Sequence, residues 1–134
     1  MIVVDASAIG AVLMPDEGGA MAEAVREAFR TTVHVPSIWP SEVANIIING
    51  LRRKRFDENH YIQAKRIADV LVPMAVIEPD APVAALIELG RALSLSAYDA
   101  SYVIACQRLN APLLTGDGPL RRAALSLGLT LVHP

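Results

Sequence analysis

Four acidic residues occupy the same kind of position in this chain, where an apolar run gives way to a predicted helix: Asp5, Glu42, Asp99 and Asp117. Acids so far apart in sequence can meet only if the fold is a parallel sheet whose strand ends line up. Carboxylates brought together repel one another and raise each other's pKa unless a cation lies between them. We therefore expect an oxygen-ligand site for Mg²⁺ or Mn²⁺, the ions that such ligands suit.

Apolar runs alternating with helical periodicity predict the elements that would position these acids. Strands are expected at residues 2–4, 33–35, 74–77, 112–115 and 129–132. Helices are expected at residues 7–13, 20–29, 37–51, 58–70 and 82–93, from residue 96 through residue 106, and at residues 118–127. Strands separated by helices need crossover connections, which favour a mostly parallel sheet covered by helices. We predict a three-layer α/β/α fold with a mostly parallel central sheet, in a single domain of residues 1–134.

Each acid also has a structural explanation that needs no metal. Asp5 and Asp117 stand where helix N-caps are expected. Glu42 lies in the first turn of its helix, where a negative charge is favourable. Asp99 follows Ser96 with the spacing of a capping box. Capping explains the acids one by one, but it gives no reason why an acid should follow nearly every strand, so the set favours a metal site.

Composition narrows the classes of protein to which the chain can belong. No stretch approaches the roughly 20 apolar residues that a membrane span needs. The first residues lack the basic leader of a secretory signal, which leads us to expect a cytoplasmic protein. The single cysteine, Cys106, cannot form a disulfide within the chain, and the three histidines lack the spacing of zinc ligands.

The net charge of −2 argues against a protein that coats nucleic acid by bulk attraction. It does not exclude a local groove, because positive charge is clustered in two places. The candidates for nucleic-acid contacts are Arg52, Arg53, Lys54 and Arg55 in one cluster and Arg121 and Arg122 in the other. The first cluster is also explained as a solvated helix end, where cations complement the helix dipole.

The acid-bearing segments resemble the PIN-domain family, and specifically the VapC-type ribonuclease toxins of type II toxin–antitoxin pairs. The resemblance covers nearly the whole chain and rests on residues 3–7, 41–45, 90–102 and 113–120. It implies that Asp5, Glu42, Asp99 and Asp117 are the catalytic residues and hold the metal. It also implies that Ser7 and Thr115 support the site by hydrogen bonding and that Asn45 is a recurrent polar position near it. Gly118 departs from the bulkier residue common after the last aspartate.

The resemblance implies a Mg²⁺- or Mn²⁺-dependent endoribonuclease that hydrolyses RNA phosphodiester bonds with a metal-activated water. The expected partners are an RNA substrate, a small VapB-like antitoxin and a second copy in a homodimer, with no membrane. Helices at residues 20–29 and 46–51 offer apolar surface for the antitoxin, unless that surface is buried core. The alternatives within the family are a PIN nuclease in RNA processing outside toxin–antitoxin systems and a catalytically silent PIN scaffold or binding module.

Two other classes of protein place acids at strand ends. A receiver-like signalling domain needs a lysine near a late strand end, and no lysine follows Lys65. A phosphatase of the haloacid dehalogenase type needs a second aspartate two residues after the first, where this chain has Ser7 after Asp5. Neither class fits the chain as well as the PIN-domain family.

Overall fold

Four short parallel strands form the centre of the molecule in the computed structural model, which describes residues 1–134. They are β1 (Ile2–Val4), β2 (Val33–Val35), β3 (Val76–Ile77) and β4 (Leu113–Leu114), arranged in the order β3-β2-β1-β4. All three pairings are parallel, as the sequence predicts. The connection changes direction at β1, because the chain first builds β2 and β3 on one side of it and then places β4 on the other. In such sheets this reversal opens a crevice at the carboxyl ends of the strands.

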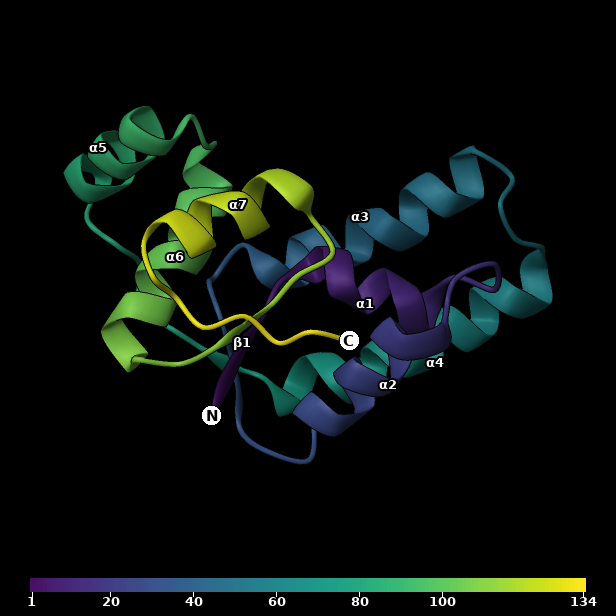
Figure 1. The fold of residues 1–134 in the computed structure, drawn as a ribbon. Coiled ribbons are helices and arrows are strands. Elements are labelled where there is room, and N and C mark those ends of the chain that lie inside the picture. The colour runs from purple at the N-terminus through teal and green to yellow at the C-terminus, as the bar shows by residue number, and fades with distance from the viewer.

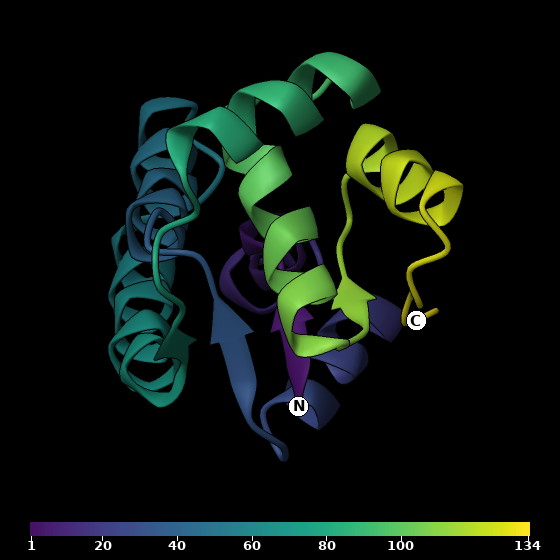
Figure 2. The same ribbon diagram turned by 90° about the vertical axis from the view of Figure 1, so that its left-hand side faces the viewer.

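Seven helices surround the sheet and give the molecule three layers (Figure 1). They are α1 (Ala6–Leu13), α2 (Gly19–Ala28), α3 (Trp39–Arg52), α4 (Glu58–Met74), α5 (Val83–Leu93), α6 (Ala97–Leu109) and α7 (Gly118–Ser126). In Figure 2, α6 crosses the near face of the sheet, and α1 and α2 lie behind it. The three-layer prediction is therefore confirmed. None of the helices is long and apolar enough to cross a membrane.

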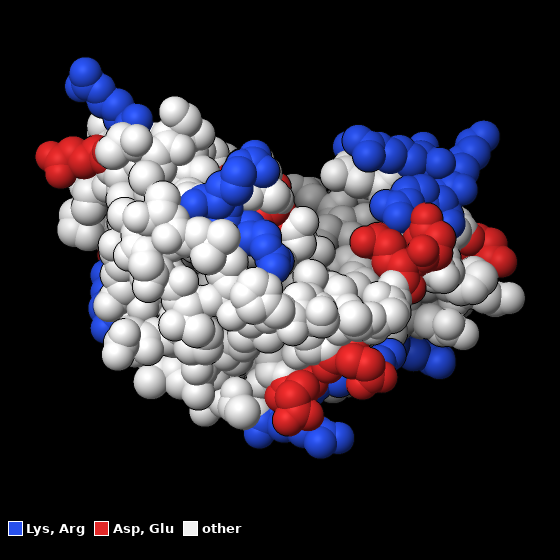
Figure 3. Space-filling model, in the orientation of Figure 1, with Lys and Arg blue, Asp and Glu red and all other residues white.

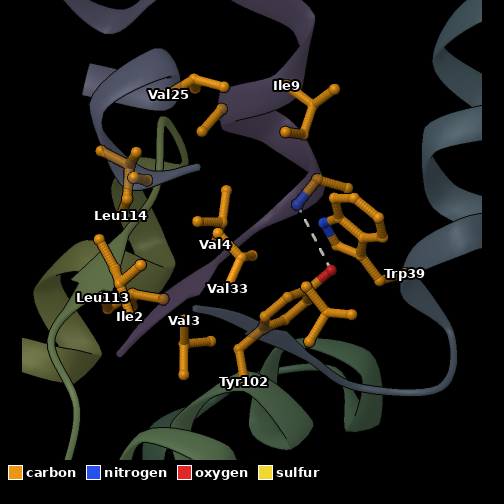
Figure 4. Packing of buried hydrophobic residues seen from close by; sticks show 14 of the residues in the cluster. Ile2, Val3, Val4, Ile9, Val25, Val33, Trp39, Tyr102, Leu113 and Leu114 are labelled. Carbon is orange, nitrogen blue, oxygen red and sulfur yellow. Dashed lines mark hydrogen bonds between the residues drawn. The ribbon is translucent and has the colours of Figure 1, made fainter. Parts of the chain in front are cut away.

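The strands are apolar along their whole length because helices cover both faces of the sheet. Val3 and Val4 point to opposite faces and are both fully buried (Figure 4). The α6 positions that face the core are mostly small, including Ala100 and Cys106, so this helix packs closely on the sheet. Its one large fully buried side chain is Tyr102.

Most predicted elements match the structure to within three residues at each end, and two differ more. The strand expected at residues 129–132 is a single bridge between Leu131 and Leu113, because β4 is only two residues long before the chain turns toward α7. The helix expected at residues 58–70 continues to Met74 and so takes the first residue of the strand predicted at 74–77. It tolerates Pro73 because this residue lies in the last turn, where the missing N–H removes a bond only at the end of the helix.

The turn between α5 and α6 sets the position of Asp99, and it depends on a close approach at Gly90. Ser94 ends α5 in the left-handed conformation, and the Leu95 N–H donates to the Gly90 carbonyl at 2.9 Å. A Cβ on Gly90 would lie 2.9 Å from the Leu95 carbonyl oxygen. The chain can therefore turn this tightly only with glycine at position 90.

We expect Gly90→Ala to lower the free energy of unfolding by about 1–3 kcal/mol, because the backbone carbonyl must move to admit the methyl group. Gly10→Ala in α1 is the matched control, since its Cβ would meet only a Glu17 side-chain oxygen, at 3.4 Å. This control should raise the free energy of unfolding by up to about 1 kcal/mol, the usual helix preference for alanine. Urea denaturation measures both changes, and a stabilising Gly90→Ala would contradict the tight turn.

Candidate active site

One pocket of about 250 Å³ at the carboxyl ends of β1 and β4 brings the predicted acids together. Its lining comprises Asp5, Ala6, Ser7, Glu42, Ile46, Asp99 and Asp117. The four acids come from four elements: the end of β1, the first turns of α3 and α6, and the N-cap of α7. In Figure 3 a few acidic atoms are visible beside a hollow at the top of the molecule, partly covered by Lys or Arg atoms, and further Lys or Arg atoms lie on the other side of the hollow.

Asp5 is the most deeply placed acid, with an exposed fraction of 4%. Its side chain does not cap α1, so the capping explanation is wrong for this residue. Instead its Oδ2 accepts hydrogen bonds from the Ser7 hydroxyl at 2.6 Å and the Thr115 hydroxyl at 2.7 Å. Both hydroxyls are held in turn, because the Gly116 N–H donates to Ser7 and the Asp117 N–H donates to Thr115. The other oxygen of Asp5, Oδ1, makes no protein hydrogen bond and is free to bind a ligand.

Asp117 caps α7 and lines the pocket at the same time. Its Oδ2 accepts from the Leu120 N–H at 2.9 Å, as the capping explanation predicts. This bond fixes the side chain without neutralising its charge. A structural role and a place in the pocket are therefore compatible for this residue.

Asp99 is held at the start of α6 by Ser96. Its N–H donates to the Ser96 hydroxyl at 3.1 Å, which starts α6 as the sequence predicts. Burial, followed by the charges of Asp117 and Asp5, raises the pKa of Asp99 above its ordinary value, and a hydrogen bond with the Ser96 side chain opposes this change.

Glu42 reaches the pocket from the first turn of α3. The buried Tyr102 hydroxyl donates to its Oε1 at 2.6 Å. Burial is the main cause that raises the pKa of Glu42, the Tyr102 hydrogen bond opposes this change, and the charges of Asp5 and Asp99 add to it. No basic side chain forms an ion pair with any of the four acids, since every ion pair of the protein lies elsewhere.

The donor set fits a hard divalent cation. As the side chains stand, no three acids are close enough to one another to ligate a single ion directly. Mg²⁺ typically binds one or two carboxylates and keeps several waters, so it does not need three direct ligands. The four carboxylates supply a concentrated negative charge with oxygen ligands, which is the chemistry such an ion prefers.

Not every predicted residue lines this pocket. Asn45 is exposed on α3 and does not contribute to the lining, whereas Ile46 does. Tyr102 was not among the predicted site residues, although it lies in the predicted helix from residue 96 through residue 106. The available signal was a hydroxyl among small apolar core residues, because a buried tyrosine hydroxyl usually needs a partner.

A second pocket of about 210 Å³ continues from the first and shares Ser7 and Ile46 with it. Asn49, Arg53 and Arg55 are among its other lining residues. Arg55 is paired with Asp16 at 2.9 Å and with Glu17 at 3.2 Å. Arg52 and Lys54 line neither pocket. Within the first basic cluster, Arg53 is therefore the cation that lines the groove without an acidic partner.

The second basic cluster lies on α7, on the other side of the acids. Arg121 donates to His133 Nδ1 at 2.8 Å, away from the pocket lining. Arg122 packs over Gly118, where a Cβ would lie 3.2 Å from its Nη1. The glycine, which directly follows Asp117, therefore leaves room for the Arg122 guanidinium over position 118. This contact gives a physical reason for the departure from the family pattern at position 118.

The raised pKa values predict an unusual dependence of stability on pH. The folded protein binds protons at Glu42 and Asp99 more tightly than the unfolded chain does. The stability gained by protonation is therefore present at acid pH and is lost as pH rises through the folded-state pKa values. We expect Glu42→Gln to raise the free energy of unfolding of metal-free protein at neutral pH, and we expect this gain to shrink on acidification. Urea denaturation across the acid-to-neutral range measures the effect.

Glu88→Gln, on the exposed side of α5, is the matched control. This control should not raise the free energy of unfolding at neutral pH. An equal gain in both variants, or a Glu42→Gln gain that grows on acidification, would show that the pocket does not penalise the ionised form.

Comparison with known proteins connects this geometry to a family. The model of the PIN domain matches residues 2–125. The chain is 38% identical over 120 residues to the protein named VapC ribonuclease Mb0985 of Mycobacterium bovis, with 87% of this chain and 86% of the relative covered.

Two solved structures share the fold at lower identity. PAE2754 from Pyrobaculum aerophilum has a TM-score of 0.72 at 20% identity and covers 91% of this chain and 84% of its own. Mycobacterium tuberculosis VapC20, described as a sarcin-ricin loop cleaving toxin, has a TM-score of 0.63 at 17% identity, with both chains fully covered. On the family model and the VapC ribonuclease relative, the chain belongs to the PIN domain family and, within it, to the VapC group.

Proposed function

We propose that this protein is a metal-dependent endoribonuclease and the toxin of a type II toxin–antitoxin pair. The observation that supports this most strongly is the pocket in which four carboxylates from separate elements meet without a cationic side chain. A silent scaffold would have no need to keep such mutually repelling charges together. Relatives named as VapC ribonucleases support the same activity and the same partnership.

The proposed metal is Mg²⁺ or Mn²⁺, held by Asp5, Glu42, Asp99 and Asp117 directly or through water. When bound, such an ion supplies a Lewis acid that activates water and neutralises charge on a phosphoryl group. The Oδ1 atom of Asp5 would be available to bind the ion, because Ser7 and Thr115 donate hydrogen bonds only to Oδ2. Asp99 lines the same pocket and is a further candidate for a direct ligand.

The residues of the chain orient the reactants. Glu42 has one oxygen engaged by Tyr102, and its Oε2 is left to orient a water in the pocket. Ser7 and Thr115 hold Asp5 in one rotamer, so its free oxygen keeps a fixed position relative to the other acids. A preorganised site of this kind pays little reorganisation cost during the reaction.

The proposed substrate is an RNA segment that can enter the hollow, such as a loop or a single strand. A protein of net charge −2 lacks the wide basic surface that binds long duplexes by charge alone. Arg53 in the adjoining pocket and Arg122 over Gly118 would contact phosphates on either side of the acids. Single-stranded loops are the usual targets of sequence-specific recognition in RNA.

The proposed protein partners are a VapB-like antitoxin and a second copy of the chain, acting in the cytoplasm. On α2, Ala22, Val25 and Ala28 are buried, so most of its apolar face is core rather than docking surface. Apolar surface is exposed instead on α3 and on the adjacent α4, at Ile48, Leu51, Ile62, Val70 and Met74. This surface suits the apolar segment of an antitoxin. Co-purification of a small partner would distinguish the toxin from a PIN nuclease of RNA processing.

Replacing an acid of the pocket should abolish both metal binding and cleavage. We expect Asp5→Asn and Asp99→Asn each to lower Mn²⁺ affinity and the rate of RNA cleavage by more than the roughly 10- to 100-fold that changes outside the ligand shell cost. Calorimetric titration with Mn²⁺ and cleavage of total cellular RNA measure the two effects. Asp69→Asn, on the exposed side of α4, is the control and should match wild type. Unchanged Mn²⁺ affinity in both pocket variants would contradict the proposed metal site.

The two arginines at the pocket should contribute to RNA binding through phosphate contacts. In an Asp99→Asn background that prevents cleavage, we expect Arg53→Ala and Arg122→Ala each to reduce the slope of log affinity against log salt by about 0.7, the value of one phosphate contact on a single strand. Arg52→Ala is the matched control, since this residue lines neither pocket and, unlike Arg122, does not pack against Gly118 next to Asp117. Fluorescence anisotropy with a single-stranded RNA oligonucleotide gives the slopes. Equal losses in Arg52→Ala and Arg53→Ala would indicate nonspecific charge attraction instead.

A further inference from the structure

A single buried hydroxyl connects two of the four acid-bearing segments. Tyr102 lies on α6 with an exposed fraction of 0%, and its hydroxyl contacts two elements outside that helix. The Ala6 N–H, at the start of α1 and directly after Asp5, donates to it at 3.4 Å (Figure 4). The hydroxyl donates in turn to Glu42 Oε1 on α3, at 2.6 Å.

The chemistry of the partners fixes the direction of these hydrogen bonds. A backbone N–H can only donate, so the Tyr102 oxygen is the acceptor toward Ala6, and its single proton is available for Glu42. No other protein group donates to the Glu42 carboxylate. The Tyr102 bond is therefore the one polar contact that holds this side chain against the wall of the pocket.

The hydroxyl has no hydrogen-bond partner other than the Ala6 N–H and Glu42. The indole of Trp39 lies beside Tyr102 in Figure 4, and its buried Nε1 finds no hydrogen-bond partner at all. Tyr102 packs as phenylalanine would, and what its hydroxyl adds is the contact with Glu42.

We propose that Tyr102 is a positioning residue for the acid pocket: its hydroxyl holds the Glu42 carboxylate in the orientation that leaves Oε2 for the metal or its water. The inference rests on the proposed function, since the pocket must bind a cation for this orientation to matter. Through the Ala6 N–H the same hydroxyl also restrains the backbone next to Asp5. The Tyr102 hydroxyl on α6 therefore fixes the position of Glu42 relative to Asp5, although these two acids are 37 positions apart in the sequence.

Tyr102→Phe tests the inference because it removes the hydroxyl and keeps the ring. We expect the variant to bind Mn²⁺ 10- to 100-fold more weakly, the usual cost of losing a group that orients a metal ligand. We expect kcat for RNA cleavage to fall by a similar factor and KM for RNA to stay unchanged. Tyr98→Phe, one turn earlier on the same helix and 60% exposed, is the matched control and should resemble wild type in both measurements.

A double variant tests whether Tyr102 acts through Glu42. On a Glu42→Gln background, Tyr102→Phe should weaken Mn²⁺ binding by less than about twofold, because residues that act as a unit show strongly non-additive effects. Additive losses would overturn the positioning role. If Tyr102→Phe equals Tyr98→Phe while Glu42→Gln still weakens Mn²⁺ binding, the inference fails and the proposed function stands. If wild type does not bind Mn²⁺ at all, both fail.

A measurement on wild type remains decisive if Tyr102→Phe does not fold. A buried hydroxyl that donates to a carboxylate at 2.6 Å should give a slowly exchanging, downfield proton resonance in NMR. This resonance should shift when Mg²⁺ is added and should move in Glu42→Gln. A resonance that Mg²⁺ leaves unchanged would overturn the inference.

Discussion

The structure depends on the parallel register of β1 and β4. Val4 lies beside Leu114 in that register, so the residues that follow both strands emerge next to each other. Asp5 and Thr115 form a hydrogen bond of 2.7 Å across this point, although they are 110 positions apart. The sheet order places this contact where the connection reverses direction, which is where open α/β sheets form their binding crevice. The carboxylates of α3, α6 and α7 are arranged around this fixed pair.

The pocket keeps its charges together with hydroxyls and backbone N–H groups rather than with cations. Ser7, Thr115 and Tyr102 donate to carboxylates, and the Leu120 N–H donates to Asp117. Such donors orient an acid and leave its negative charge in place. An arginine or lysine inside the pocket would relieve the repulsion and would also occupy the position a metal needs. The raised pKa values of Glu42 and Asp99 reflect the cost of this arrangement in the metal-free protein.

Sequence reasoning succeeded where local signals and the global fold agree. Apolar strand runs and Ser96 at the start of α6 carry such signals, and the structure has each of them. It failed at residues 129–132, because a strand pattern does not reveal that the neighbouring strand is only two residues long. The sequence could not show whether each acid caps a helix or only lines the pocket. Asp5 and Asp117 both stand at the N-cap position of a helix, but only the Asp117 side chain makes the capping hydrogen bond. For Tyr102 the sequence signalled that the hydroxyl needs a partner, but it could not name Glu42, which is distant in sequence.

The distribution of charge around the pocket links substrate binding to metal binding. The acids lie at the bottom of the hollow, and Arg53 and Arg122 lie beside it, so a polyanion is attracted at the rim and repelled at the centre. Arg55 adds little to the attraction, because Asp16 and Glu17 already pair with it. A phosphate can approach the acids closely only when a divalent cation offsets their charge. Under the proposed function, the ion that supports the chemistry would therefore also be the condition for seating the scissile phosphate. Glu42, held by Tyr102, would serve both requirements.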